Sequence, residues 1–485
     1  MGLRERAIQG VVWSALRVCG GNAISFFVQI LLVRLLAPKS FGLVALAIVF
    51  TALLRTLQDQ GLTKALIQRK DLEPQHLDSA FWVMLAAGAV MTSLCVILAG
   101  PIATALGEPR LAEILPWLAL NLVIGSFGSV QAALLTRRMR FKSLALRSLS
   151  GTFAGGVVGV VMAFSGFGIW SLIGLRLVDA VVATIALWSL SSWRPSLSFS
   201  IRHFKEIFGF GANAMGIALL NWSEKHLDNL LIGIFLNAKS LGFFAIARAM
   251  VRRVNSALTI SVADVALPTF SRMQTERDRM GDAFLTATQV VAVVAFPSFL
   301  GMLVVTPDFV LTLFGERWTP SIPLMQILCL GMLLPAVTHF TGPVIMACGR
   351  PSWLLSIKMV GLVVRVAAFL IGVRWGLIGI AVALVSARYV MLPVSLTLAM
   401  RLTNLRAARL RRRLAGPLIA ALGMSAAVTA LRLSIEDHTT PALRLALCTA
   451  AGMASYALLL GVVARPQATL VLDLVRSALS RPPKT

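Results

Sequence analysis

Basic side chains occur inside long apolar stretches of this sequence, where a charge without compensation is costly. About eleven Lys and Arg residues lie in such stretches, and each would cost roughly 2.5–3.5 kcal/mol at the centre of a membrane on insertion scales. Residues close to the end of a stretch can extend to the interface, whereas deeper ones need an acidic partner or a water-filled cavity. The set comprises Arg17, Arg34, Arg55, Arg176, Lys225, Arg248, Arg252, Arg253, Lys358, Arg365 and Arg388.

Acidic residues in these stretches are fewer. Asp179 follows Arg176 by three positions, so the two share a helix face and could form a local ion pair. Glu224 and Asp228 lie one helical turn apart, with Lys225 within reach of Asp228. Structural pairing is one interpretation. The other is a coupling site for a cation, H⁺ or Na⁺, because neighbouring carboxylates raise each other's pKa. Glu224, Asp228 and Asp179 are therefore the candidate ion-coupling residues.

A surplus of positive charge remains after this pairing. Arg17, Arg55, Arg248 and Arg252 belong to apolar stretches at equivalent places in two halves of the chain, as the repeat described below indicates. A cleft lined by these residues would bind an anion, and the arginine fork fits phosphate geometry. Local structural pairing of each arginine is the alternative. These four arginines are the candidate phosphate-binding residues.

No catalytic centre is apparent. The chain has no P-loop, so we expect no nucleotide site. No cysteine has metal-ligand spacing, and we expect neither a metal site nor a cofactor apart from a coupling cation. The predicted external loops are too short for the reactive loop of a membrane glycosyltransferase or polymerase, so we do not expect an enzyme. The histidines are scattered at His76, His203, His226, His339 and His438.

Composition indicates where these charged residues lie. Of 485 residues, 58% are hydrophobic and only 13% are charged, with a mean hydropathy of +0.84. A soluble protein carries roughly a quarter charged residues. The apolar runs are long enough to cross a ~30 Å hydrocarbon layer as helices. The sequence therefore predicts an all-α polytopic membrane protein, and the net charge of +25 is assigned to loops rather than to nucleic-acid binding.

Hydropathy predicts about fourteen transmembrane helices, the first of them an uncleaved span. Alternate loops differ strongly in charge, with about 27 Lys and Arg on one side and about seven on the other, which predicts that both termini are cytoplasmic. The predicted spans are 10–36, 41–60, 80–106, 112–136, 147–165, 168–191, 208–236, 241–267, 284–314, 321–348, 353–373, 376–400, 414–433 and 441–463.

A repeat divides the chain. The segment 31–50, LLVRLLAPKSFGLVALAIVF, returns 200 residues later as LIGIFLNAKSLGFFAIARAM, with seven identical positions. Each copy contains the end of one span, a Lys-Ser-x-Gly turn and the start of the next. Six spans separate the copies, so they have the same orientation, as in parallel repeats. This predicts a six-helix lobe over 1–200, a second over 201–402, and a basic linker, two extra helices and a cytoplasmic tail over 403–485.

Two local patterns add detail. Gly151, Gly155 and Gly159 form overlapping GxxxG motifs that predict close helix packing. The segment between Gly61 and Leu77 predicts a short interfacial helix with a basic edge, a solvated loop being the alternative.

Several segments resemble the polysaccharide transporters, the Wzx-type oligosaccharide flippases in their colanic-acid-exporter-like branch. This family belongs to the multidrug/oligosaccharidyl-lipid/polysaccharide exporter superfamily. The resemblance covers about residues 1–400, and no single motif carries it. The segments include FGLVALAIVFTALLRTLQDQGLTKALIQRKD, SFGSVQAALLTRRMRFKSLALRSL, GFGIWSLI, LGFFAIARAM, LPTFSRMQ and GERWTPSIPLMQILCL.

The resemblance implies a flippase of the bacterial inner membrane. Such proteins translocate undecaprenyl-diphosphate-linked oligosaccharides by alternating access, for surface or exopolysaccharide and lipopolysaccharide synthesis. The implied partners are the lipid-linked oligosaccharide, membrane lipids and polysaccharide polymerase or export proteins. Basic residues hold the diphosphate in the family, and Arg17, Arg55 and Arg248 or Arg252 lie in the spans that carry arginines in the related lipid II flippase.

The chain also departs from its relatives. Its first span lacks the acidic proton site of the superfamily's drug extruders. Lys358 and Arg365 stand in a C-terminal-lobe helix where the lipid II flippase has the acids of its sodium site. The alternatives are a multidrug or small-molecule extruder of the same fold, a membrane enzyme that polymerises glycans, and a lipid II flippase.

Overall fold

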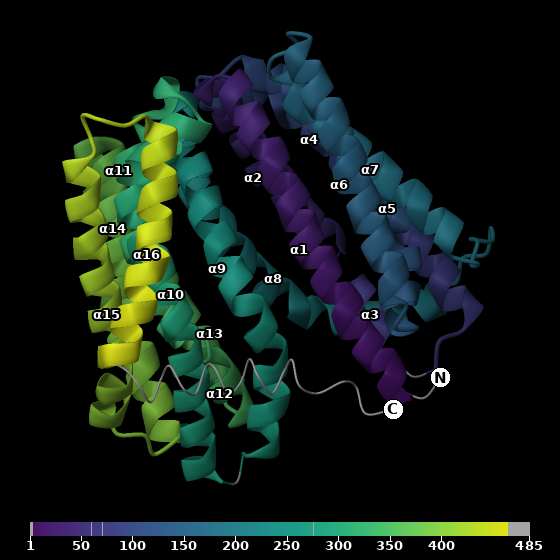
Figure 1. Cartoon of the computed structure of the whole chain (residues 1–485). Coiled ribbons are helices and arrows are strands. Elements are labelled where there is room, and N and C mark those ends of the chain that lie inside the picture. The colour runs from purple at the N-terminus through teal and green to yellow at the C-terminus, as the bar shows by residue number, and fades with distance from the viewer. Residues whose placement is uncertain (1–2, 60, 70, 275, 464–485) are drawn as a thin grey trace. The chain divides into compact units, whose positions relative to one another are not determined.

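The chain is described by a computed structural model that covers residues 3–59, 61–69, 71–274 and 276–463. Within these residues, side chains are described except at 3–12, 14–16, 64, 207–214, 257–268 and 336–337. The described part is helical (Figure 1). Its α-helices are α1 (Leu3–Leu35), α2 (Pro38–Asp59), α3 (Leu62–Gln68), α4 (Pro74–Ala105), α5 (Arg110–Arg137), α6 (Phe141–Phe164), α7 (Trp170–Leu190), α8 (Ile201–Phe235), α9 (Ala238–Arg272), α10 (Arg277–Leu313), α11 (Ser321–Thr338), α12 (Thr341–Ala347), α13 (Pro351–Gly372), α14 (Gly376–Leu402), α15 (Ala407–Ser434) and α16 (Pro441–Val463).

These helices have the length and surface of membrane spans. Among the described residues, ten helical segments are long and apolar enough to cross a membrane. Large apolar side chains point outward along them, including Ile97, Phe153, Val363 and Leu458, each at least 60% exposed. Exposure of such a large apolar surface is unfavourable in water but not in contact with lipid tails. The prediction of an all-α, multi-pass membrane protein is confirmed; the count of fourteen spans stays a prediction.

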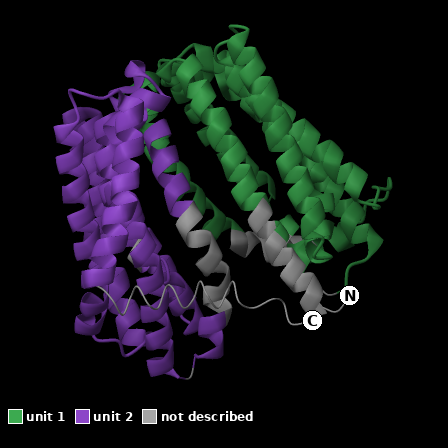
Figure 2. Cartoon of the chain, in the orientation of Figure 1, with its two compact units in different colours: residues 1–245 green, residues 246–485 purple. Residues whose placement is uncertain are grey.

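Two compact units divide the chain at 245/246 (Figure 2). Unit 1 comprises α1 to α8 and the start of α9, and unit 2 comprises the rest of α9 and everything that follows. The lobes predicted from the repeat have different boundaries from these units and stay a prediction. They comprise 1–200, 201–402 and 403–485. Residues 464–485 of the predicted tail lie outside the described residues.

Some helices end at turns that contain glycine or proline. The Gly107-Glu-Pro109 turn separates α4 from α5, and Gly349 adopts a φ of 71° between α12 and α13, as glycine does most easily. Several boundaries differ from prediction: α1, α4, α6, α8, α10 and α15 each begin six or seven residues before the predicted span. Helix α6 begins six residues before 147, because a helix can continue through Lys142 although hydropathy cannot detect it. The predicted span 321–348 is interrupted between α11 and α12, where both flanking sequences are equally apolar.

Small residues bring α6 and α7 together in unit 1. A Cβ at Gly155 would overlap the carbonyl oxygen of Leu175, and one at Gly159 would lie 2.8 Å from the Cβ of Leu175. The predicted close packing of the glycine motif is therefore confirmed. The predicted short helix is confirmed as α3, although its apolar face packs inward, with Leu62 and Leu66 buried in a core shared with α4 and α5.

The two copies of the repeated hairpin meet within unit 1. A Cβ at Gly42, at the start of α2, would overlap the carbonyl oxygen of Ala238. Reciprocally, a Cβ at Gly242, at the start of α9, would overlap the carbonyl oxygen of Pro38. The identical glycines of the repeat therefore allow two helix starts to approach each other backbone to backbone in a pseudo-symmetric contact.

This contact gives a testable prediction. Gly42→Ala and Gly242→Ala should each lower the free energy of unfolding by about 1–3 kcal/mol, because a methyl group inserted against backbone forces the helices apart. Gly21→Ala in α1 is the matched control, since no described atom lies within 4 Å of the place where the added methyl group would stand. The measurement is thermal unfolding of the purified variants in one detergent. Equal melting temperatures for all three would contradict the contact.

A buried cluster of charged side chains joins three helices of unit 2. Asp308, fully buried near the end of α10, accepts hydrogen bonds from Arg444 Nε at 2.5 Å and Arg432 Nε at 2.6 Å. Arg432 lies in α15 and Arg444 in α16. An apolar core that includes Phe296, Met424 and Cys448 joins the same three helices. The two helices that have no counterpart in the repeat are thus attached to the rest of unit 2 by both charge and packing.

A candidate anion-binding cavity in unit 1

A cavity of about 580 Å³ opens between the helices of unit 1. This volume is within the range of small-molecule sites, roughly 300–1,000 Å³. Its wall is formed by α2, the start of α3, α4, α5, α6 and α8. The polar and charged residues that line it are Arg55, Thr56, Gln58, Asp59, Thr63, Asn121, Ser126, Ser129, Arg147, Asn221, Lys225 and His226.

Positive charge predominates in this lining. Arg55, Arg147 and Lys225 contribute three cations from three helices, and Asp59 is the one carboxylate among the lining residues. Asp59 accepts a hydrogen bond from Thr63 Oγ1 at 2.5 Å. Three cations and one carboxylate leave an excess of two positive charges among the Lys, Arg and Asp residues of the lining, which in a low-dielectric wall attracts an anion.

Buried polar side chains hold the wall in place. Gln58 is 7% exposed, and its Nε2 donates to Ser126 Oγ at 2.5 Å and to the carbonyl of Leu122 at 3.2 Å, joining α2 to α5. Trp222 Nε1 donates to the carbonyl of Val49 at 3.1 Å, joining α8 to α2. Because these bonds fix α2, α5 and α8, they also fix Arg55 on α2 and Lys225 on α8.

Arg147 is the functional candidate that the sequence analysis missed. Hydropathy puts Arg147 at the first position of the predicted span 147–165, whereas the structure places it nearly two turns into α6, half-buried and lining the cavity. It interacts electrostatically with Arg17, Arg55 and Asp179. One signal was available: Arg147 precedes Gly151 by four residues, on the glycine face that packs against α7, and a Cβ at Gly151 would lie 2.6 Å from Asp179 Oδ1.

The structure brings some of the predicted residues together. Arg17 and Arg55 both lie within electrostatic range of Arg147, and Arg55 lines the cavity. Arg248 and Arg252 belong to unit 2, where Arg248 is 6% exposed and Arg252 is exposed, although they are only one turn apart on α9. Whether these two act with the cavity stays a prediction.

The predicted ion-coupling residues have separate surroundings. Asp179 interacts with Arg176, as predicted, and also with Arg147. Asp228 is 2% exposed on α8, and Glu224 is half-buried one turn before it. Between them, Lys225 lines the cavity.

The chain is similar to proteins of polysaccharide biosynthesis. The model of the family described as "Polysaccharide biosynthesis protein" matches residues 31–323. The chain is 31% identical to the succinoglycan biosynthesis transport protein ExoT of Rhizobium meliloti, over 68% of this chain and 67% of that protein. It is 29% identical to the lipopolysaccharide biosynthesis protein WzxC of Escherichia coli, over 72% of each chain.

A solved structure has the same fold. The lipid II flippase MurJ, in an inward closed conformation, matches with a TM-score of 0.76, covering 97% of this chain and all of the solved one at 14% sequence identity. At that identity the match concerns the fold alone. The family model and the relatives agree with the resemblance found in the sequence, and the chain belongs to the polysaccharide biosynthesis protein family of Wzx-type membrane transporters.

Proposed function

We propose that this protein is a flippase that translocates an undecaprenyl-diphosphate-linked oligosaccharide across the bacterial inner membrane. The observation that carries the proposal is the cationic cavity of unit 1, enclosed by apolar helices, with Arg55, Arg147 and Lys225 in its wall. A diphosphate is the anionic part of such a substrate. The curated relatives are transport and biosynthesis proteins of surface polysaccharides, so the substrate serves surface, exopolysaccharide or lipopolysaccharide synthesis.

The chemistry of binding follows from the side chains. Each arginine fork donates parallel hydrogen bonds to two phosphate oxygens, and Lys225 adds a point charge. Arg55 and Arg147 are the main diphosphate contacts in this proposal, and Arg17 strengthens the local positive potential. Arg248 and Arg252 keep their predicted role as diphosphate-binding residues. The polyprenyl chain remains in lipid throughout, because moving it into the polar cavity would lose hydrophobic free energy.

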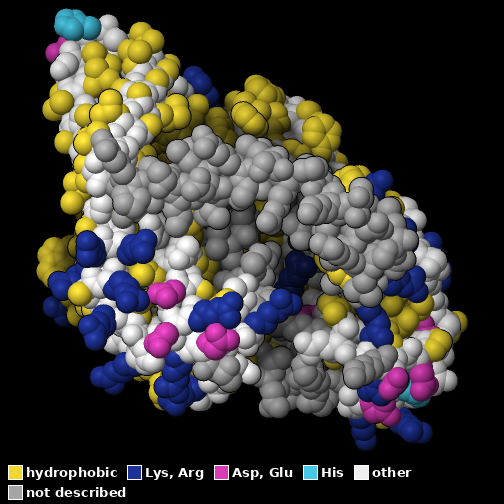
Figure 3. Space-filling view, turned by 60° about the horizontal axis from the view of Figure 1, so that its bottom comes forward, with side chains coloured by type: hydrophobic (Ala, Val, Ile, Leu, Met, Phe, Trp, Pro, Cys, Tyr) yellow, Lys and Arg dark blue, Asp and Glu magenta, His cyan; other side chains and the backbone are white. Residues whose placement is uncertain are grey.

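Transport occurs by alternating access in this proposal. The helices form fourteen spans, in two six-helix lobes with two additional C-terminal helices, and both termini are cytoplasmic. Figure 3 shows Lys and Arg side chains gathered on the face that comes forward there, which supports one strongly basic side. The protein is a transporter rather than an enzyme, and it delivers its substrate to polymerase or export proteins.

Coupling to an ion gradient is assigned to carboxylates near the cavity. Glu224 and Asp228 flank Lys225 on α8, so binding of H⁺ or Na⁺ there would change the charge next to the diphosphate. Asp179, although a predicted coupling residue, is balanced by Arg147 and Arg176. We place coupling first at Glu224 and Asp228, because both lie next to Lys225, which lines the cavity.

A deletion strain tests the proposed function. Cells that lack the protein should accumulate a completed lipid-diphosphate oligosaccharide on the cytoplasmic face and lose the corresponding surface polysaccharide. Mass spectrometry of extracted lipids identifies the sugar, and a plasmid copy of the wild-type gene should reverse both effects. Unchanged surface polysaccharide without accumulation would contradict the proposal and favour drug or metabolite export.

A further inference from the structure

Two histidines and a carboxylate meet away from the cavity, where α4 and α8 begin. Glu73 is the N-cap residue of α4, His76 lies in its first turn, and His203 lies in the first turn of α8. Glu73 and His203 are 130 positions apart in the chain, so sequence spacing could not reveal the group. All three belong to unit 1, and the predicted topology puts them on the cytoplasmic side.

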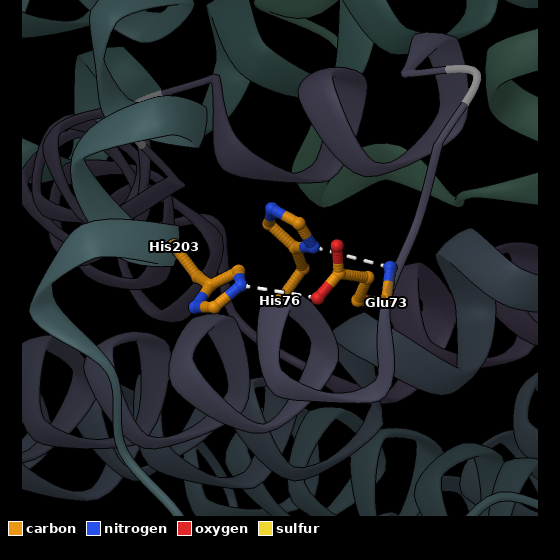
Figure 4. A group of neighbouring side chains, drawn as sticks. All are labelled: Glu73, His76 and His203. Atoms are coloured by element: carbon orange, nitrogen blue, oxygen red, sulfur yellow. Dashed lines mark hydrogen bonds and ion pairs between the residues drawn. The ribbon is translucent and has the colours of Figure 1, made fainter.

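The three side chains point toward one another (Figure 4). One ligand atom from each residue lies within 4.8 Å of the other two. His203 Nε2 is 3.2 Å from Glu73 Oε2, and the imidazole centroids of His76 and His203 are 4.5 Å apart at 87°. Ligand atoms in a tetrahedral zinc site lie roughly 3–3.5 Å apart, as Zn–N bonds of about 2.0–2.1 Å require. Small side-chain rotations would therefore complete the geometry.

The outer hydrogen bonds match those of a metal site. His76 Nε2 lies 3.2 Å from Glu206 Oε2, and His203 Nδ1 lies 2.7 Å from Ser200 Oγ. Each histidine thus has one nitrogen toward the group and the other on an outer oxygen. In this structure His203 Nε2 donates to the Glu73 carboxylate, so Nδ1 accepts from the Ser200 hydroxyl; metal binding at Nε2 would move the ring proton to Nδ1, where Ser200 Oγ can accept it. This is the arrangement that fixes the tautomer and orientation of metal-ligating histidines.

The outer carboxylate is held by basic side chains. Arg69 Nη2 contacts Glu206 Oε2 at 2.5 Å, and Arg202 Nε contacts Glu206 Oε1 at 3.4 Å. His76 Nδ1 accepts a hydrogen bond from the Glu73 N–H at 3.1 Å, so the proton of the neutral ring is on Nε2, which faces the same carboxylate.

We propose that Glu73, His76 and His203 form a binding site for one divalent transition-metal cation, with Zn²⁺ as the best-fitting ion. Two histidines and one carboxylate are an established Zn²⁺ ligand set that leaves a fourth position for water. The Glu73 side chain is 64% exposed, which gives the ion a path from solvent, whereas the His76 side chain is 1% exposed. Binding replaces the Glu73 N–H···His76 and His203···Glu73 hydrogen bonds.

A bound ion would fasten two helix starts together. The linker before α8 already contacts α4, because Asp78 accepts hydrogen bonds from Ser196 N and Ser198 Oγ at 3.0 and 2.9 Å. A metal bridge would add a stronger link between the same elements. The metal site would therefore stabilise or regulate the contact between the starts of α4 and α8 in unit 1. None of its three ligands lines the proposed anion cavity.

Metal titration tests the site. Full-length protein without a histidine tag, stripped with EDTA, is titrated with Zn²⁺ against a chromophoric chelator. We expect one Zn²⁺ per chain. His203→Gln and Glu73→Gln should weaken binding by more than about a hundredfold, and Glu206→Gln by about 10–100-fold, as outer-shell changes do. His438→Ala, in the exposed loop between α15 and α16, should bind as wild type.

Folding is checked separately. His76 is buried and caps α4, so the decisive variants are those at His203 and Glu73, and their melting temperatures without metal should stay close to wild type. Co²⁺ should give the visible absorption of a four-coordinate site in the wild type and not in His203→Gln. Weak Zn²⁺ binding that is the same in wild type and in both decisive variants would overturn the proposal and leave a hydrogen-bonded network only.

Discussion

Replacing Arg55 or Arg147 by alanine is expected to reduce polysaccharide export strongly while the protein remains in the membrane. Both side chains line the cavity of unit 1 and lie within electrostatic range of each other. A hydrogen bond to a charged group contributes about 1.5–3 kcal/mol. Loss of one arginine should therefore weaken substrate binding about ten- to a hundredfold, and the double variant should lose more than either single one.

The export assay needs two comparisons. Arg55→Lys and Arg147→Lys keep the charge without the fork, so they should retain part of the activity if bidentate phosphate contact matters. Arg34→Ala is the matched control, because Arg34 is an exposed arginine in the last turn of α1 and should not affect export. Surface polysaccharide is quantified against the amount of each variant in membranes. Normal export by both alanine variants would rule out this cavity as the diphosphate site.

Replacing Asp308 by asparagine should lower the free energy of unfolding more than Gly42→Ala or Gly242→Ala does. This fully buried carboxylate accepts hydrogen bonds from Arg432 and Arg444, whose side chains are 17% and 8% exposed. Removal of its charge would leave two largely desolvated arginines with Glu436, 3.4 Å from Arg432, as the remaining carboxylate. Breaking a buried ion pair in this way costs about 3–5 kcal/mol. We expect α15 and α16 to separate from α10 first on heating.

A matched surface pair controls this prediction. Asp282 pairs with Arg409 at 3.1 Å, with both side chains more than 60% exposed, and such pairs contribute about 0–1 kcal/mol. Asp282→Asn should therefore melt close to wild type, whereas Asp308→Asn should melt far below it and be less abundant in membranes. Similar melting temperatures for the two variants would show that the buried cluster does not stabilise unit 2.

The sequence was sufficient to predict an all-helical, multi-pass membrane protein, because hydropathy is a property of continuous segments. The glycine face of α6 was likewise predictable, since Gly151, Gly155 and Gly159 recur at helical spacing. The repeat also identified Gly42 and Gly242 as equivalent. It could not indicate that they touch, because internal symmetry alone does not specify which equivalent elements are in contact.

The missed residues depend on contacts between distant segments. Asp308 and its partner Arg444 are 136 positions apart, and a single acid near the end of an apolar run carries no local signal. Arg147 stood at the edge of the predicted span because hydropathy places the start of a span where the apolar run starts, whereas helix α6 extends further toward the N-terminus. Such sites depend on tertiary packing, which periodicity does not report.

Reconstituted transport tests the central claim most directly. Purified protein is placed in liposomes with the lipid-linked oligosaccharide extracted from the deletion strain, and an impermeant glycosidase is added outside. With wild-type protein, inner-leaflet substrate should become accessible and nearly all of the sugar should be cleaved, whereas Arg147→Ala liposomes should protect the inner-leaflet pool. If wild-type protein leaves the inner pool as protected as in protein-free liposomes, although it is correctly folded, the chain does not flip this lipid and the account is contradicted.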